Sequence, residues 1–249
     1  MAQGPPFIRG RRIRVFGGPN GSGKTTILKQ IDDRFDLGHY INADEIEAEI
    51  LRKGILDLAN YGISKSDAHG LNKIITEHSI YKKAINDGFG FDLEIDGTIV
   101  HNPNQKTHSY EASLLSDIIR NVLLKKGSKF SFETVMSHGS KIDFLKNSTA
   151  NGYRNYLYFI STESPLINIE RVKQRVKLGG HPVDKVKIED RYYRSLELLS
   201  KAVANTYRTF IFDNSKKAPT LILEIYKGSE VEFKHNLVPA WVDKYVLQQ

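Results

Sequence analysis

The chain has 249 residues, 40% hydrophobic and 26% charged, and is long enough for one α/β domain with an insertion. It contains no cysteine, which excludes disulfide bonds and thiolate metal sites and fits a reducing cytoplasm. No apolar run approaches the roughly 20 residues of a membrane span. The N-terminal residues also lack the pattern of a secretory signal. We therefore expect a cytoplasmic protein without a membrane partner.

The net charge is +7 at neutral pH. Such a positive surplus can help to bind nucleic acid or phosphorylated small molecules, and a solvated basic surface explains it equally well. No stretch of the sequence combines a basic run with the interleaved aromatic residues of a single-strand binding groove. A small-molecule partner is therefore favoured over a nucleic acid, although the charge leaves a nucleic acid open.

Hydrophobic periodicity predicts strands and helices that alternate along most of the chain. Strands are expected at 13–16, 38–41, 129–132, 156–161, 209–212 and 220–226. Helices are expected at 24–31, 43–53, 109–126, 140–151, 167–178 and 183–205. This order is typical of an α/β fold in which helices cover both faces of a parallel sheet.

The segment 54–108 departs from this alternation, and we interpret it as an insertion within a single domain of residues 1–249. It contains an amphipathic stretch at 71–85 and a hairpin that turns near Asp96-Gly97.

A phosphate-binding motif follows the first predicted strand. It matches G-x-x-x-x-G-K-[ST] in full and consists of Gly18, Pro19, Asn20, Gly21, Ser22, Gly23, Lys24 and Thr25, with Thr26 next. Glycines permit a tight curl whose N–H groups face phosphate oxygens. Lys24 can reach the β- and γ-phosphates, and the Thr25 hydroxyl suits a Mg²⁺ ligand. The motif predicts the three-layer sandwich of P-loop NTPases, with a nucleotide and Mg²⁺ as cofactors. ATP is favoured over GTP, because the sequence lacks the N-K-x-D element with which GTP-binding switches usually read the base.

Polar residues follow the second and third predicted strands, where an α/β sheet carries its site. Asp44 is a candidate for the group that accepts the proton of an attacking hydroxyl, and a helix N-cap is the alternative. Glu45 either contacts substrate or complements the helix dipole. Glu133 either faces metal and substrate or is an ordinary loop carboxylate. Thr134 and His138 could orient a substrate, although a lone histidine is more often structural.

The segment 167–205 reads as two helices around a Gly-Gly-His-Pro turn and forms a candidate lid. Arginines suit the charge of a transferring phosphoryl group because they remain charged and donate in a planar fork. Arg175, Arg191 and Arg194 flank the turn and are candidate phosphate ligands. Arg171 is expected on a solvated helix face, near an ion pair between Glu170 and Lys173.

Several segments in this order resemble the zeta-toxin-like P-loop kinases: "GGPNGSGKTT", "INADEI", "SFETVMS", "RVKQRVKLGGHPVDKVKIEDRYYRSLELL" and "FDNS". The resemblance covers 13–52 and 109–226. It implies a kinase that transfers the ATP γ-phosphate to a hydroxyl, which in zeta toxins belongs to a UDP-activated amino sugar.

The resemblance also implies roles for individual residues and a partner. Asp44 looks like the family's proton acceptor, and Glu133 like its substrate-side glutamate. Arg175 and one of Arg191 or Arg194 stand where the family binds phosphate. Asp213 and Asn214 fall where the nucleotide base lies, and an antitoxin-like protein becomes a possible partner.

This chain departs from the family at 54–108, where family members run almost directly into the next helix. The insertion would lie near the acceptor site, so the acceptor can differ from a sugar nucleotide. Two alternatives remain open at this point. One is a polynucleotide 5′-hydroxyl kinase, which would use the positive charge, and the other is a non-catalytic ATP-binding regulatory module.

Overall fold

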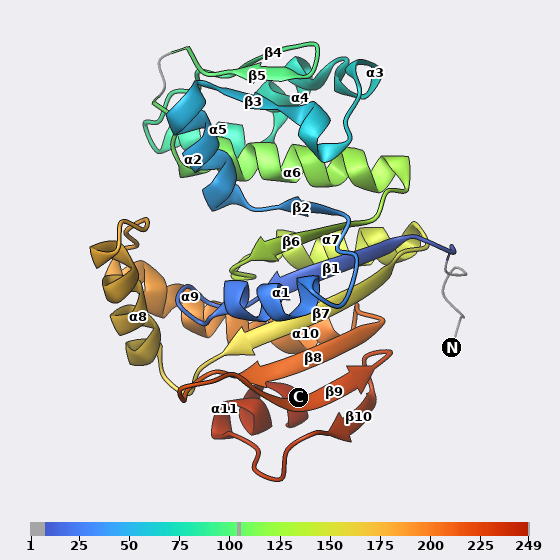
Figure 1. Ribbon diagram of the computed structural model, residues 1–249, viewed down its shortest axis with the longest axis vertical. Coiled ribbons are helices and arrows are strands. Elements are labelled where there is room, and N and C mark those ends of the chain that lie inside the picture. Colours follow the sequence, from blue (N-terminus) through green and yellow to red (C-terminus); the bar gives the residue numbers. More distant parts are fainter. Residues whose placement is uncertain (1–7, 104–105, 249) are drawn as a thin grey trace. The chain divides into compact units, whose positions relative to one another are not determined.

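The protein is described by a computed structural model over residues 8–103 and 106–248, which form two compact units. The first unit contains the chain up to Leu37 and again from Ser131, and the second contains Gly38–Phe130 (Figure 1). The segment 54–108 lies within the second unit. That it is an insertion into one kinase domain stays a prediction.

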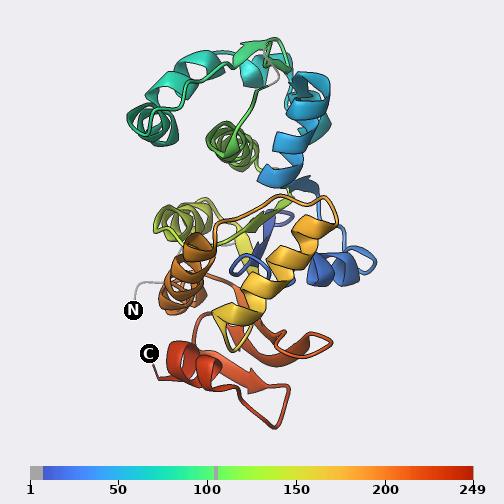
Figure 2. The same ribbon diagram turned by 90° about the vertical axis from the view of Figure 1, so that its left-hand side faces the viewer.

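A mixed β-sheet forms the centre of the first unit, with the strand order β10-β9-β8-β7-β1-β6. Strand β1 pairs in parallel with β7, and β7 pairs in parallel with β8. Helix α1 covers one face of this sheet, and α7, α9 and α10 cover the other (Figures 1 and 2). The predicted three-layer α/β sandwich is therefore confirmed. The strands are β1 (Arg12–Gly17), β6 (Phe130–Thr134), β7 (Arg154–Ser161), β8 (Arg208–Asp213), β9 (Thr220–Tyr226) and β10 (Glu230–Phe233).

The prediction of an entirely parallel sheet is wrong at the edge, because β9 and β10 run antiparallel to their neighbours. The segment 214–219 between β8 and β9 is too short for the crossover that a parallel pair requires. Strand β10, which the sequence did not reveal, returns through Lys227 and Gly228. Both have positive φ, 48° and 75°, and with Ser229 they form the loop between Tyr226 and Glu230, which pair across the hairpin.

The helices of the first unit mostly keep their predicted bounds. The exception is the helix expected at 183–205, which begins at Lys185 and breaks at Leu198 into α9 and α10. Its first turn is capped by Asp184, whose side chain accepts a hydrogen bond from Lys187 N–H at 3.1 Å. The helices are α1 (Lys24–Asp32), α7 (Ser140–Ala150), α8 (Pro165–Lys177), α9 (Lys185–Glu197), α10 (Leu199–Val203) and α11 (Ala240–Val242), followed by a π-helical turn, η2 (Asp243–Leu247).

The core of the first unit explains where its polar side chains gather. Val15 of β1, Phe159 of β7 and Ile211 of β8 are fully buried, as expected for central parallel strands covered on both faces. Because β1, β7 and β8 are parallel, their carboxyl ends lie at one edge of the sheet. The phosphate motif, the start of α8 and the segment after β8 therefore meet at that edge.

The second unit packs helix α2 against the long helix α6 and adds a three-stranded antiparallel sheet of order β3-β5-β4. The buried faces of α2 and α6 include Ile46, Ile50, Leu115 and Ile119. The elements are β2 (His39–Ile41), α2 (Ala43–Lys53), β3 (Ile55–Asp57), η1 (Leu58–Tyr61), α3 (Lys65–Ala68), α4 (Leu71–Glu77), α5 (Ser79–Asn86), β4 (Glu94–Asp96), β5 (Ile99–His101) and α6 (Ser109–Lys126).

Several predictions for this unit are confirmed. Helix α6 has its predicted bounds and ends at Gly127, whose φ of 73° is the left-handed conformation typical of a helix stop. The hairpin of β4 and β5 turns at Gly97, directly after Asp96. The amphipathic stretch at 71–85 is divided, because extended backbone at His78 (φ −69°, ψ 141°) separates α4 from α5. No helix in the described ranges is long and apolar enough to cross a membrane.

Candidate phosphate-binding site

The phosphate loop, residues 17–25, connects the end of β1 to the start of α1. Gly18 N–H donates to the carbonyl oxygen of Thr134 at 3.2 Å, which joins the loop to the end of β6. A side chain at Gly18 is impossible, because a Cβ there would lie 2.0 Å from the carbonyl oxygen of Ile160. Within the loop, Ser22 N–H donates to the carbonyl oxygen of Pro19 at 3.2 Å. The loop is thus tightly packed against two strand ends.

Two buried asparagines hold the outer side of this loop. Asn168 of α8 donates its amide to the carbonyl oxygen of Asn20 at 2.7 Å. Asn214, directly after β8, donates its amide to the carbonyl oxygen of Ser22 at 2.8 Å. The exposed fractions of Asn168 and Asn214 are 0% and 7%, so both hydrogen bonds are shielded from water.

These two bonds determine where the loop N–H groups point. In a trans peptide the N–H lies opposite the preceding C=O, and the described residues contain no cis peptide. Because the Asn20 and Ser22 carbonyls face the asparagines, the N–H groups of Gly21 and Gly23 point the other way. Neither N–H has an acceptor within the described part of the chain. The loop therefore offers two oriented donors of the kind that phosphate oxygens accept.

Lys24 and Thr25 begin α1 beside these donors. The Lys24 ammonium group donates to the carbonyl oxygens of Gly18 and Pro19, at 3.0 and 3.1 Å, so it folds back over the loop. The Thr25 hydroxyl donates to a carboxylate oxygen of Glu133 at 3.1 Å. The predicted metal ligand and the predicted substrate-side glutamate are thus neighbours.

The other predicted residues after β6 form a local turn. Thr134 accepts a hydrogen bond on its hydroxyl from Met136 N–H at 3.1 Å, and Met136 has a positive φ of 57°. His138 is exposed, and its Nδ1 accepts from Ser140 N–H at 3.2 Å, just before α7. This contact favours the alternative of a structural loop histidine, whereas the substrate roles of Thr134 and His138 stay predictions.

The candidate lid contains α8, α9 and the turn between them, and its arginines differ in environment. Arg194 is exposed and paired with the Asp190 carboxylate one turn earlier on α9, which raises the pKa of Arg194 above its ordinary value. Arg191 is half-buried. It lies on the same helix face as the buried residues Ile188 and Ser195. The two arginines that the sequence could not separate are therefore distinguishable by their surroundings.

Arg175 and Arg171, both on α8, are half-buried. Arg175 donates from Nη2 to the carbonyl oxygen of His181 at 2.9 Å and so closes the Gly-Gly-His-Pro turn. Arg171 donates to the carbonyl oxygen of Lys216 at 3.2 Å, which corrects the expectation of a solvated side chain. Arg175 Nε and Arg171 Nη1 are buried and lack a hydrogen-bond partner among the described residues. The predicted contact between Glu170 and Lys173 is confirmed at 3.9 Å.

The segment after β8 is fixed by its own side chains. Asp213 accepts hydrogen bonds from Trp241 Nε1 at 2.9 Å and from the Ser215 hydroxyl at 2.7 Å. Together with the bond from Asn214 to the loop, these contacts use both predicted base-binding residues within the protein. A contact of Asp213 or Asn214 with a nucleotide base stays a prediction.

Asp44 and Glu45 belong to the second unit, in the first turn of α2, and both are exposed. The helix cap is Asn42, whose side chain accepts from Asp44 N–H at 3.0 Å. The alternative in which Asp44 is itself the cap is therefore wrong. Its carboxylate makes no cap contact, and its catalytic role stays a prediction, as does the substrate role of Glu45.

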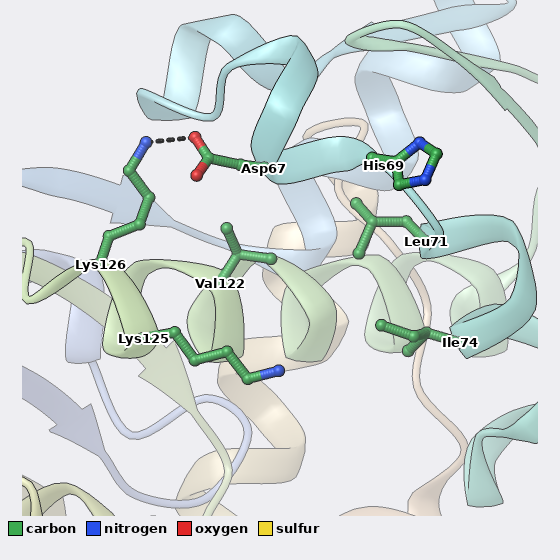
Figure 3. Close-up of a pocket in the computed structure, with 7 residues that line it drawn as sticks. All are labelled: Asp67, His69, Leu71, Ile74, Val122, Lys125 and Lys126. Carbon is green, nitrogen blue, oxygen red and sulfur yellow. Dashed lines mark hydrogen bonds and ion pairs between the residues drawn. The ribbon is translucent and has the colours of Figure 1, made fainter.

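The second unit also contains a hollow of about 320 Å³ between α6 and the segment of α3 and α4 (Figure 3). Its floor is apolar, and its rim carries a hydrogen-bonded ion pair between Asp67 and Lys126. This ion pair, with the Ser64 hydrogen bonds, lowers the pKa of Asp67 to about 2. The lining residues are Asp67, His69, Leu71, Ile74, Val122, Lys125 and Lys126.

The sequence matches none of the known family models. An uncharacterised protein of Haemophilus influenzae is 33% identical over 69 residues, which is 28% of this chain and about half (49%) of that protein. Among solved structures, a chain of the AvrRxo1-ORF1:AvrRxo1-ORF2 complex with sulphate ions is 11% identical with a TM-score of 0.50. The match covers 91% of this chain and 61% of that one.

Two further solved structures are similar at lower scores. The first comes from the PezAT chromosomal toxin–antitoxin system of Streptococcus pneumoniae, at 13% identity, a TM-score of 0.48, and coverage of 99% of this chain and 82% of that chain. The second is a gluconokinase from Sinorhizobium meliloti, at 15% identity, a TM-score of 0.41, and coverage of 85% and 86%.

The sheet order, the phosphate loop before α1 and the AvrRxo1 likeness agree. The chain has the three-layer α/β fold that the phosphate-loop motif predicts, and it shares this fold with the AvrRxo1 chain. In this fold, the elements that carry the predicted phosphate loop, Glu133 and the lid arginines all belong to the first unit.

Sequence reasoning missed Asn168 and Trp241, which hold the phosphate loop and the segment after β8. A signal for Asn168 exists, because it occupies a core position of α8 between the buried residues Pro165 and Val172. A polar side chain in an apolar stripe usually has a specific partner. Trp241 carried no such signal, since its contact with Asp213 joins segments without a shared pattern.

The residues present fit a nucleoside triphosphate with Mg²⁺. Gly21 and Gly23 supply N–H donors, Lys24 supplies a cation, and the start of α1 adds its helix dipole. Mg²⁺ bound with ATP usually takes one or two protein oxygens together with phosphate oxygens and water. The Thr25 hydroxyl and the Glu133 carboxylate, 3.1 Å apart, are suitable oxygens.

Proposed function

We propose that this protein is an ATP-dependent kinase that transfers the γ-phosphate to a hydroxyl group of a small molecule. The observation that carries this proposal is the pair of oriented N–H donors at Gly21 and Gly23, beside Lys24 and the contact between Thr25 and Glu133. Two buried asparagines fix the carbonyl groups of Asn20 and Ser22 and so hold these donors in place.

Bound ATP would supply the phosphoryl group, and Mg²⁺ bound with it would neutralise phosphate charge. In this proposal the loop N–H groups and Lys24 bind the phosphates and hold the γ-phosphate in position. Thr25 and Glu133 hold the metal, with Glu133 also facing the substrate as the family resemblance implies. Thr134, Glu45 and His138 are proposed to orient the acceptor.

The lid arginines are proposed to stabilise charge that develops on the transferring group. Arg175 and Arg171 both have a buried nitrogen without a partner among the described residues, which suits an anionic ligand. Between the two arginines of α9, the half-buried Arg191 is the better candidate, because Arg194 is exposed and already paired with Asp190. We propose Arg175 and Arg191 as the pair that contacts phosphate.

Asp44 is proposed to accept the proton of the attacking hydroxyl. The carboxylate is exposed and is not used as a helix cap, so it is available for this role. The acceptor class follows from the resemblance to zeta toxins, which makes a UDP-amino sugar the first candidate. An antitoxin-like protein partner is also proposed, as the family resemblance implies, and the similar AvrRxo1 chain comes from an AvrRxo1-ORF1:AvrRxo1-ORF2 complex.

The test is phosphate transfer from γ-labelled ATP, with Mg²⁺, to a panel of acceptors. The panel contains UDP-N-acetylglucosamine, other nucleotide sugars, nucleosides and an oligonucleotide with a 5′-hydroxyl. Asp44→Ala is the test variant, and Glu47→Ala on the same helix is the control. We expect label on a small-molecule hydroxyl that is lost in Asp44→Ala and kept in Glu47→Ala. Label on the oligonucleotide alone, or equal transfer by both variants, would contradict the proposal.

A further inference from the structure

Asn168 uses both atoms of its amide to connect the lid to the phosphate loop. It lies on α8, fully buried, and its Nδ2 donates to the carbonyl oxygen of Asn20 at 2.7 Å. Its Oδ1 accepts a hydrogen bond from the hydroxyl of Thr162. The orientation of the amide is fixed, because a carbonyl oxygen such as that of Asn20 requires the nitrogen side as its donor.

Thr162 carries the connection to the second lid helix. It follows β7 and is fully buried, and its carbonyl oxygen accepts a hydrogen bond from the hydroxyl of Tyr192 on α9 at 2.6 Å. Burial raises the pKa of Tyr192 above its ordinary value, which keeps this hydroxyl protonated as the donor. A chain of hydrogen bonds therefore runs from α9 through Thr162 and Asn168 to the phosphate loop.

The packing between α8 and the loop leaves little room for independent movement. A Cβ at Gly21 would lie 2.5 Å from the backbone oxygen of Asn168, so the loop and the first turns of α8 touch through their backbones. A shift of Asn168 must therefore change the peptide between Asn20 and Gly21. Because that peptide is planar and trans, rotating the Asn20 carbonyl also rotates the Gly21 N–H.

We propose that Asn168 is a positioning residue that couples α8 and α9 to the orientation of the Gly21 N–H in the phosphate loop. The proposal rests on the kinase function proposed above, in which that N–H binds a nucleotide phosphate. Coupling of this kind is reciprocal: if the lid arrangement changes nucleotide affinity, nucleotide binding changes the lid equally. Asn214 holds the neighbouring carbonyl from the segment after β8, whereas Asn168 holds its carbonyl from α8 itself.

Three variants and one matched control separate coupling from simple packing. Asn168→Ala removes both bonds, and Asn168→Asp keeps the shape and the acceptor but loses the donor to Asn20. Thr162→Val removes the hydroxyl and introduces no buried charge, so it remains informative if Asn168→Asp fails to fold. The control is Ser195→Ala on α9, which removes a buried bond from its hydroxyl to the Tyr192 carbonyl oxygen at 2.9 Å. That bond lies within the helix and does not reach the loop.

The first measurement is hydrogen exchange of the ligand-free proteins at the amides of the phosphate loop. The second is a titration with a fluorescent ATP analogue in the presence of Mg²⁺, combined with exchange at α9 in the nucleotide-bound state. In Asn168→Ala we expect about ten-fold faster exchange in the loop and about ten-fold weaker binding, equivalent to about 1.4 kcal/mol. Thr162→Val should shift both in the same direction, and Ser195→Ala should shift neither.

Nucleotide should also slow exchange in α9 of the wild-type protein and of Ser195→Ala, but not of Asn168→Ala. Loop exchange in Asn168→Ala equal to that in Ser195→Ala would overturn the coupling. The coupling would also be overturned if nucleotide still slowed hydrogen exchange in α9 of Asn168→Ala. If the wild-type protein binds no nucleotide, the kinase proposal fails. The ligand-free exchange then still decides whether Asn168 positions the loop.

Discussion

Substitution of Gly21 by alanine tests whether the phosphate loop is held as tightly as its contacts indicate. Gly21 has φ of 76°, and its Cβ position lies 2.5 Å from the backbone oxygen of Asn168. Gly10 provides a matched control, because its φ is 90° and nothing lies within 4 Å of its Cβ position. Alanine at either position should cost about 1–2 kcal/mol for left-handed backbone. The two variants therefore differ mainly in the steric clash between the new Cβ and the backbone of α8, which only Gly21→Ala creates.

The clash adds a second cost at Gly21 alone. Ordinary contacts begin near 3.4 Å, so a methyl group at 2.5 Å must displace the backbone of α8 by most of an ångström. That displacement breaks the bond between Asn168 and Asn20, and an unsatisfied buried group costs about 1–3 kcal/mol. Gly21→Ala should therefore reduce the free energy of unfolding by about 1–3 kcal/mol more than Gly10→Ala does.

The assay is urea unfolding of both variants, together with a titration with ATP and Mg²⁺. Gly10→Ala should bind ATP as the wild-type protein does, and Gly21→Ala should bind it more weakly. Equal unfolding free energies for the two variants, with equal ATP affinities, would refute the argument from packing.

Three other predictions address the metal, the lid and the second unit. Glu133→Gln should raise the Mg²⁺ concentration needed for half-maximal ATP binding, whereas Asp143→Asn on α7 should leave it unchanged; a shared response would contradict the metal role. Arg191→Ala should lower the rate of phosphate transfer by about 10²-fold, and Arg194→Ala should have little effect; the reverse order would exclude Arg191. The pKa of Asp67 in the folded protein is about 2, against an ordinary value of 3.8. The ion pair therefore contributes its full stability at any pH above the ordinary pKa, and this contribution is lost as the pH falls through about 2. Asp67→Asn should therefore be less stable than the wild-type protein near neutral pH, with the difference disappearing in strong acid. A difference that persists there would contradict this assignment.

Local patterns were sufficient for several elements of each unit. The bounds of α2 follow from helical periodicity, those of α6 from periodicity and the glycine stop at Gly127, and β1 with α1 follows from the phosphate motif. Strand β10 was missed, although its sequence Glu-Val-Glu-Phe alternates polar and apolar residues. The run is four residues long and all four are exposed, so it has no buried apolar face. It is held by antiparallel pairing with β9 instead.

The candidate site shows the same division between local and distant information. The motif alone identified Lys24 and Thr25, because the chemistry depends on residues adjacent in sequence. Asn168 holds the carbonyl of Asn20, which is 148 positions away, and no local pattern records that contact. Arg191 and Arg194 have the same residue type, and only the fold reveals that Arg194 is exposed and paired with Asp190.

The central claim is that the phosphate loop binds ATP, and calorimetric titration of Mg²⁺-ATP tests it most directly. Lys24→Ala removes the ammonium group that lies over the loop, and Lys29→Ala removes a like charge from the exposed end of the same helix. We expect the wild-type protein and Lys29→Ala to bind with equal affinity and Lys24→Ala to bind no ATP. Unchanged affinity in Lys24→Ala, or no binding by the wild-type protein, would contradict the account.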